Sequence, residues 1–157
     1  IVNTRGLILN KIIKKLNYEK IKLNITAVFT LSQLKKIKLS INKKTPVIIS
    51  IFSGRIADNG IDPEILIKKS IRLFKKYKNV KILWASTREV FNYFQAKRCG
   101  CHIITMGPKF IEKLKSKKVT LNNYSIDTVK QFYSDGKKSK FKIWKFFLID
   151  LIFLLNN

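Results

Sequence analysis

Hydrophobic residues along this chain recur with two different periods. Short, continuous apolar runs rich in β-branched residues are typical of buried strands, and four of them occur, at residues 24–30, 46–52, 80–85 and 101–105. Elsewhere apolar residues return every three or four positions, which predicts helices at about 7–16, 31–37, 64–77 and 86–98, from Pro108 onward, and at about 125–134. Strands and helices therefore alternate through most of the sequence.

This alternation predicts an α/β fold in which helices connect parallel strands. A (β/α)8 TIM barrel and an open, doubly wound sheet both produce such a pattern, and the pattern alone does not separate them. In both architectures ligands bind at the carboxyl ends of the strands, where this chain carries short polar segments. Neither G-x-G-x-x-G nor G-x-x-x-x-G-K-[ST] occurs, which removes the usual dinucleotide-binding and P-loop interpretations.

The last part of the chain differs in character. Residues 142–155 (KIWKFFLIDLIFLL) are strongly apolar, but Lys145 and Asp150 interrupt the run, and it is short for a membrane span. We therefore expect no transmembrane span. A docked amphipathic helix, an oligomer contact or an artefact of cloning or translation is favoured, with a helix lying in a membrane interface as the other interpretation.

A net charge of +24 suggests a partner with phosphate groups, because clustered basic residues neutralise phosphates and release counterions. However, the lysines are spread over nearly every predicted helix, and only five basic residues are arginines: Arg5, Arg55, Arg72, Arg88 and Arg98. A surface of lysines alone lacks the base-reading arginines and stacking aromatics of a specific nucleic-acid binder. We expect a solvated lysine-rich surface without a specific nucleic-acid partner. A non-catalytic module that binds nucleic acid or anionic membrane is the alternative.

The residues most often used for metal binding and nucleophilic catalysis are few. Cys99 and Cys101 are one residue apart, too close for a relaxed disulfide, and no other Cys or His cluster could complete a zinc site. His102 is the single histidine, and we do not expect it to form a Ser-His or Cys-His catalytic relay. We expect reduced thiols, a structural histidine and no metal.

Small polar residues near the ends of three predicted strands are better candidates for a site. Residues two apart on a strand point to the same side, which groups Asn24 with Thr26, Ser50 with Phe52, and Trp84 with Ser86. If that side is the interior of a barrel, these strands direct small polar groups toward the rim at which ligands bind. Isolated hydroxyls in strands are usually structural, so their recurrence on three strands is the informative observation.

Two arginines follow these strands. Arg55 comes after the second strand and Arg88 after the third, in a chain that otherwise uses lysine. A guanidinium offers a planar fork that binds phosphate oxygens in pairs, whereas an ammonium group offers a single charge. The residues alone leave phosphate binding and surface ion pairs as equal alternatives.

At these positions the sequence resembles a known family. The segments NITAVFTLSQ (24–33), SIFSGRIADNGIDP (50–63) and WASTR (84–88) are similar to those of the transaldolase and fructose-6-phosphate aldolase family. The resemblance covers about residues 1–141. It implies the C-terminal half of a TIM barrel, with about four βα units, and leaves residues 142–157 as an apolar tail.

The resemblance also implies chemistry. Family members form an imine between a lysine and a ketose carbonyl, and they transfer or cleave a dihydroxyacetone unit. By position, Asn24 and Ser50 match residues that bind the dihydroxyacetone hydroxyls, and Thr26 matches the threonine that holds a catalytic water. Arg55, Ser86 and Arg88 match the cradle for the terminal phosphate of the sugar. Ile51 and Ser53 depart from the usual Pro and Val, which puts substrate preference in doubt.

The Schiff-base lysine of the family has no counterpart in this sequence. Its position would fall a few residues before Ile1, and a first residue other than Met also suggests a fragment. Whether the N-terminal half is truncated or decayed stays open. The implied parent is a cytoplasmic enzyme of the pentose phosphate pathway without cofactors, able to form homo-oligomers, that acts on sugar phosphates such as fructose 6-phosphate and sedoheptulose 7-phosphate. The 157-residue chain alone is expected to be inactive.

Overall fold

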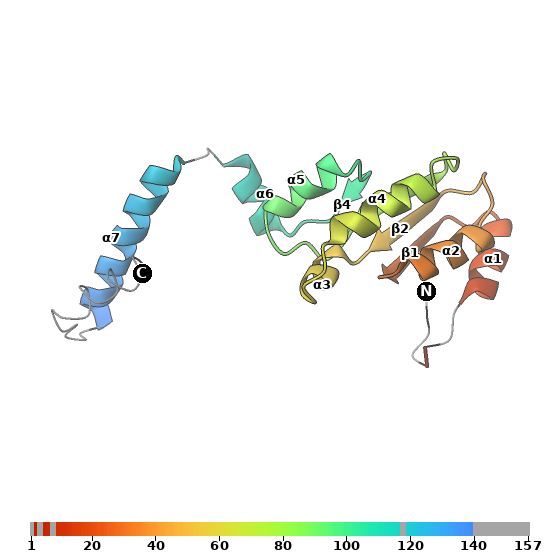
Figure 1. Cartoon of the computed structure of the whole chain (residues 1–157), viewed down its shortest axis with the longest axis horizontal. Coiled ribbons are helices and arrows are strands. Elements are labelled where there is room, and N and C mark those ends of the chain that lie inside the picture. Colours follow the sequence, from red (N-terminus) through yellow and green to blue (C-terminus); the bar gives the residue numbers. More distant parts are fainter. Residues whose placement is uncertain (1, 3–4, 7–8, 117–118, 140–157) are drawn as a thin grey trace, which may run out of the picture. The chain divides into compact units, whose positions relative to one another are not determined.

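A four-stranded parallel sheet forms the centre of the fold (Figure 1). The computed structural model describes residues 2, 5–6, 9–116 and 119–139. The chain divides into two units, residues 1–115 and 116–157, which we describe separately. The strands follow one another in the order of the sequence: β1 (Leu23–Val28), β2 (Val47–Ile51), β3 (Val80–Trp84) and β4 (Ile103–Ile104).

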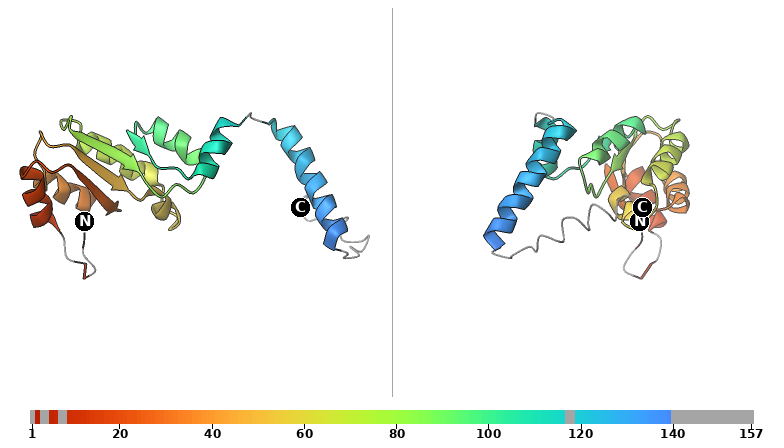
Figure 2. Two further views of the ribbon diagram at one scale, coloured as in Figure 1. Left: turned by 180° about the vertical axis from the view of Figure 1, so that it is seen from behind. Right: turned by 60° about the vertical axis from the view of Figure 1, so that its left-hand side comes forward.

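Helices connect the strands, and each connection returns the chain to the end of the sheet at which the preceding strand began. The helices of the first unit are α1 (Asn10–Tyr18), α2 (Leu31–Ser40), α3 (Ser53–Ala57), α4 (Pro63–Leu73), α5 (Phe91–Arg98) and α6 (Pro108–Lys115). In Figure 1 α2, α4 and α5 lie in front of the strands, and the view from behind shows the strands in front (Figure 2, left). These helices therefore lie on one face of the sheet.

The pairing of the strands defines which residues face the helices. Ile49 of β2 pairs with Ile82 of β3, and Ile51 pairs with Trp84. All four side chains are almost completely buried and belong to one hydrophobic cluster with residues of the helices. Burial of one such side chain stabilises the fold by roughly 1.5–3 kcal/mol.

The opposite face of the sheet carries the remaining strand residues. Asn24 pairs with Ile48, which pairs with Lys81, and Ser50 pairs with Leu83, which pairs with Ile103. None of these side chains is in the hydrophobic cluster that the helices cover. In a closed barrel, the face away from the helices is the interior. The structure is that of a half-barrel in this respect, with its helices outside.

Local sequence signals fix where the helices begin. The Thr30 hydroxyl accepts a hydrogen bond from the Gln33 backbone N–H at 3.2 Å, and the Gln33 side chain accepts from the Thr30 N–H at 3.0 Å, which forms a capping box for α2. Asp62 caps α4 by accepting from the Glu64 N–H at 2.9 Å, and Pro63 occupies the first helical position. Both caps place the helix starts beside the carboxyl ends of the strands.

The second unit contains α7 (Leu121–Ser139), a 19-residue helix that includes the predicted segment 125–134. The predicted boundary between residues 141 and 142 and the apolar tail lie outside the described residues. Within the described parts of the chain, no helix combines the length and apolar content needed to cross a bilayer.

The four predicted strands and their parallel arrangement are confirmed, as is the α/β fold of a partial TIM barrel. One helix was missed, because the five residues of α3 follow directly on β2 and are too few to show a helical period. The predicted helix over residues 86–98 begins later, at Phe91. Residues 86–90 instead form a loop after β3, and this loop carries two of the candidate residues.

Candidate functional site

The carboxyl ends of β1, β2 and β3 bring together several of the candidate residues. In a parallel sheet these ends lie side by side at one end of the sheet, so segments distant in sequence become neighbours there. We call this end of the sheet, with α3 and the loop of residues 85–90, the carboxyl rim. All six candidate residues lie on it or on the strands that lead to it.

Asn24 and Ser50 are in direct contact. The Ser50 hydroxyl donates a hydrogen bond to Asn24 Oδ1 at 2.8 Å. This bond uses the amide oxygen of Asn24 and not its amide nitrogen, and the Asn24 side chain is exposed. Ser50 itself is buried, with 3% of its surface exposed. The contact therefore holds the side chain of an exposed polar residue against a fixed one, on the face of the sheet away from the helices.

Thr26 lies next to an irregularity in β1. The pairing of β1 with β2 shifts by one residue between Ile25 and Val28, and Ala27 has a positive φ of 55°. Thr26 is exposed, one residue before this strained position. A bulge of this kind increases the local twist and redirects the neighbouring side chains, a common device beside functional sites.

The predicted orientation of Trp84 is wrong. Trp84 pairs with Ile51 and is 1% exposed within the cluster that the helices cover, so Leu83 is the residue of β3 that shares a face with Ser50. The continuous apolar run VKILW gives no alternation from which the two faces could be told apart. Ser86 lies beyond the end of β3 and has a positive φ of 64°, so its direction does not follow from that of Trp84.

Arg55 lies on α3, exposed and in contact with an aromatic ring. Its guanidinium carbon is 5.3 Å from the centroid of the Phe52 ring, a cation–π distance. The Phe52 ring in turn lies 5.6 Å from that of Phe29, which follows β1. The aromatic pair supports the stem of an arginine whose charge is open to solvent at the carboxyl rim.

Ser86 and Arg88 lie against α3 through Gly54. A methyl group added to Gly54 would stand 1.6 Å from the Ser86 carbonyl oxygen and 3.1 Å from Arg88 Cγ. The Gly54 N–H donates to the Ala85 carbonyl at 3.3 Å. Only a residue without a Cβ permits this approach. Because Arg55 directly follows Gly54, the approach also brings the backbone of Arg55 close to the loop that carries Ser86 and Arg88.

Arg88 forms an ion pair that the sequence did not reveal. Both oxygens of Asp58 accept hydrogen bonds from Nε, at 3.2 and 3.1 Å, and Nη2 donates to Oδ2 at 2.6 Å. These hydrogen bonds raise the pKa of the guanidinium. Asp58 lies 30 residues away from Arg88 in the sequence, and only the close packing of α3 against the loop brings them together.

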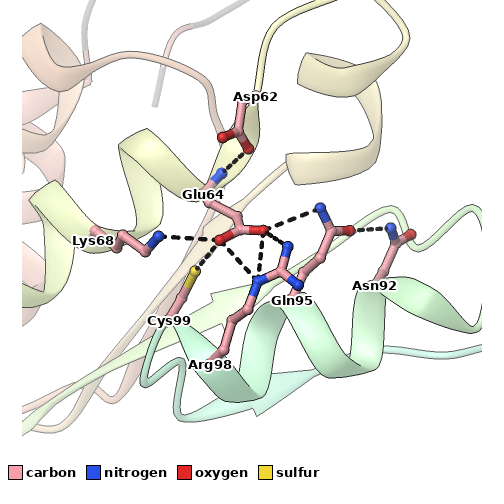
Figure 3. Close-up of polar contacts among 7 residues, drawn as sticks. All are labelled: Asp62, Glu64, Lys68, Asn92, Gln95, Arg98 and Cys99. Carbon is pink, nitrogen blue, oxygen red and sulfur yellow. Dashed lines mark hydrogen bonds and ion pairs between the residues drawn. The ribbon is translucent and has the colours of Figure 1, made fainter.

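A second acidic residue, Glu64, organises the interface of α4 with α5 (Figure 3). Glu64 is buried, and its carboxylate accepts hydrogen bonds from Arg98, from Lys68 at 3.1 Å and from Gln95 at 3.3 Å. These bonds, that with Arg98 above all, lower its pKa to about 2 despite the opposing effect of burial. Glu64 is therefore ionised at neutral pH and serves as a fixed acceptor.

The cysteines and the histidine have structural surroundings. Both thiols are free; burial raises the pKa of Cys99 to about 12, with a further contribution from Glu64, and burial also raises that of Cys101. His102 Nδ1 accepts a hydrogen bond from the Ile82 backbone N–H at 3.0 Å, and its pKa is lowered by burial and by Lys81. Among the described residues, no three His, Cys, Asp or Glu side chains gather where they could hold a metal ion.

Comparison with known proteins identifies the family. The profile of transaldolase/fructose-6-phosphate aldolase matches residues 9–145, a stretch that includes all six candidate residues and every element from α1 to α7. The chain belongs to this family.

Individual transaldolase relatives support the assignment. The chain is 35% identical to a probable transaldolase of Herpetosiphon aurantiacus over 105 residues, which are 66% of this chain and 46% of the relative. It is 35% identical to probable transaldolase 2 of Listeria monocytogenes over 111 residues, 70% of this chain and 49% of the relative. A probable transaldolase of Thermoanaerobacter is 28% identical over 134 residues, 85% of this chain and 58% of the relative. The chain thus spans about half the length of these curated relatives.

Proposed function

We propose that the carboxyl rim is the sugar-phosphate-binding part of a transaldolase or aldolase active site. Arg55, Ser86 and Arg88 would bind the terminal phosphate of the sugar. The observation that carries this assignment is the contact of Gly54 with Ser86 and Arg88, because it brings the segment of Arg55 against the loop of the other two residues. A bidentate guanidinium beside a hydroxyl suits a phosphate dianion.

The other end of the substrate would lie against Asn24 and Ser50. Their hydrogen bond fixes the orientation of the Asn24 amide, whose nitrogen can then donate to the hydroxyls of a dihydroxyacetone unit. Thr26, exposed beside the bulge, would hold the water used in proton transfer. The substrates we propose are ketose phosphates of the fructose 6-phosphate and sedoheptulose 7-phosphate type.

The reaction proposed for the parent enzyme uses a lysine imine as an electron sink for cleavage of the bond between C3 and C4 of the ketose. Lys81 is the one strand lysine among the described residues, and as the second residue of β3 it lies near the amino end. It is also two strands away from Asn24, in the same row across β2, whereas the imine lysine of the family belongs to the strand that precedes the one of Asn24. We therefore propose that the 157-residue chain binds the substrate without forming the imine.

Two measurements test these assignments. Titration with fructose 6-phosphate, with fructose as the comparison, is expected to show binding that needs the phosphate. Arg88→Ala is expected to weaken it by about tenfold or more, as loss of a charged hydrogen-bonding partner does. Arg72→Ala, in the last turn of α4, removes the same charge near the amino ends of the strands and serves as the control. Equal affinity for fructose and its phosphate would contradict the phosphate assignment.

The second measurement concerns the imine. Borohydride reduction in the presence of fructose 6-phosphate traps a Schiff base as a stable amine, which adds mass to the protein. We expect no added mass on this chain. A covalent adduct located on one lysine would show that the chain contains its own imine-forming residue.

A further inference from the structure

The loop after β3 is held from inside the protein by a side chain whose hydrogen bonds involve no side chain of a candidate residue. Asn92, on α5, is buried with 6% of its surface exposed. Its Oδ1 accepts hydrogen bonds from the backbone N–H groups of Arg88, at 2.9 Å, and of Glu89, at 3.2 Å. One oxygen therefore fixes the backbone of Arg88.

The orientation of the Asn92 amide is determined by a chain of hydrogen bonds (Figure 3). Asn92 Nδ2 donates to Gln95 Oε1 at 2.8 Å, and Gln95 Nε2 donates to Glu64 Oε1 at 3.3 Å. An ionised carboxylate can only accept hydrogen bonds. Glu64 therefore requires the nitrogen of Gln95, Gln95 then presents its oxygen to Asn92, and Asn92 must turn its own oxygen toward Arg88.

The far end of this chain is anchored on α4 and α5. Arg98 Nε donates to both Glu64 oxygens, at 2.9 and 3.1 Å, and Lys68 donates to one of them. The loop is also held on its other sides: the Thr87 hydroxyl donates to the Thr105 carbonyl, and Asp58 binds the Arg88 guanidinium. The backbone and the side chain of Arg88 are thus fixed by different residues.

We propose that Asn92 is a positioning residue for the anion-binding loop, oriented by Gln95 and Glu64 and acting through the backbone of Arg88. The inference rests on the function proposed above, since the loop matters only if Arg88 binds the phosphate. A bidentate contact depends on the direction of the guanidinium plane as well as on its charge. Release of the Arg88 backbone would therefore weaken binding although the arginine remains.

Asn42 offers a matched control within the same chain. Its Oδ1 also accepts two backbone hydrogen bonds, from Lys44 and Thr45, both at 2.8 Å. Asn42 precedes β2 and so lies at the amino ends of the strands, at the opposite end of the sheet from the carboxyl rim. Asn42→Ala removes the same kind of contact and affects stability without touching the loop.

The experiment compares the full chain with Asn92→Ala and Asn42→Ala. We expect Asn92→Ala to weaken fructose 6-phosphate binding by about five- to tenfold, and Asn42→Ala to leave it unchanged at a similar loss of thermal stability. In nuclear magnetic resonance spectra, the Arg88 Nε–H signal should shift in Asn92→Ala alone. Asn92→Asp keeps an acceptor oxygen and should restore slow exchange of the Arg88 and Glu89 amides.

Several outcomes would overturn the inference. Binding by Asn92→Ala within twofold of the unaltered chain, or an equal loss in Asn42→Ala, would assign Asn92 a merely structural role. If Asn92→Ala does not fold, Gln95→Ala provides the test. Gln95 is half-buried, and its truncation removes the hydrogen bond that orients the Asn92 amide. Weaker binding then supports the inference, and unchanged binding refutes it. Failure of the unaltered chain to bind, or of Arg88→Ala to weaken binding, refutes the proposed function and the inference together.

Discussion

Asp58 binds the Arg88 guanidinium along one edge, through Nε and Nη2, in a geometry that joins the end of α3 to the loop after β3. A guanidinium has five N–H donors in one plane. The edge formed by Nη1 and the second hydrogen of Nη2 makes no hydrogen bond with the described residues, so an anion could be bound there in the same plane. Asp58 thus orients Arg88 but also places a negative charge near the proposed phosphate.

Asp58→Asn is expected to strengthen fructose 6-phosphate binding by about two- to fivefold at low ionic strength. The asparagine oxygen can still accept from Arg88, while the repulsion between the carboxylate and the phosphate is removed. The gain should shrink as salt is added. Glu19→Gln, at the end of α1, changes the net charge equally near the amino ends of the strands and should have little effect. Weaker binding by Asp58→Asn would show that orientation outweighs repulsion.

Gly54→Ala should disrupt the phosphate cradle more than any other change of one methyl group. The added carbon would stand 1.6 Å from the Ser86 carbonyl oxygen, so α3 or the loop must move. We expect loss of measurable fructose 6-phosphate binding and a lower melting temperature. The corresponding change at Gly107, where the nearest atom would be 3.9 Å away on Phe110, should alter neither. Binding retained by Gly54→Ala would mean that the close approach is not needed.

The two faces of β2 should respond differently to truncation. Ile49 is completely buried against the helices, so Ile49→Ala should lower the free energy of unfolding by about 2–5 kcal/mol. Ser50→Ala removes one hydrogen bond to an exposed asparagine and should cost about 1 kcal/mol or less. Urea denaturation of both variants measures these values. Equal losses would contradict the assignment of the faces.

Glu64 predicts a loss of stability in acid. Its pKa falls from 4.5 to about 2 on folding, so the unfolded chain binds more protons between these values and the stabilisation is complete only above the higher one. The urea midpoint should therefore decrease as the pH is lowered from about 4.5 toward 2. Glu64→Gln should be less stable at neutral pH, because Arg98 and Lys68 lose their charged partner, and should show a shallower dependence on acid. An unchanged acid profile would contradict this role.

Cys99 should react slowly in the folded chain. Its thiol is buried and its pKa is raised to about 12, so almost no thiolate is present at about pH 8. Labelling with iodoacetamide, followed by mass spectrometry of the peptides, should modify Cys99 at a rate set by unfolding. The same reaction in urea, where both cysteines are accessible, provides the reference rate. Rapid modification under native conditions would show that the interface of α4 with α5 opens readily.

The sequence predicted the elements better than their faces. The four strands and the parallel α/β fold follow from apolar runs separated by helical periods, and these signals are local. The orientation of Trp84 failed because an uninterrupted apolar run has no alternating pattern. The positive φ angles of Ala27 and Ser86 likewise depend on tertiary packing, and neither residue type announces them.

The candidate site could be predicted as a set of residues but not as a set of contacts. Arg55 and Arg88 stood out because the chain otherwise uses lysine, and family resemblance supplied their expected role. Their surroundings come from pairs that are distant in sequence, such as Asp58 with Arg88 and Glu64 with Arg98, separated by 30 and 34 residues. Without the fold, an exposed aspartate or a helical glutamate carries no signal of its partner.

The division of the sheet into a face packed on helices and a face bearing Asn24 and Ser50 has an evolutionary consequence. Residues that hold the fold together and residues proposed to contact substrate alternate along the same strands, and Asn24 and Ser50 lie outside the hydrophobic cluster. Substitutions at the second set can therefore accumulate without a matching loss of stability. A lineage could alter the substrate preference of this sheet, or lose its activity altogether, while the strands and helices remain recognisable.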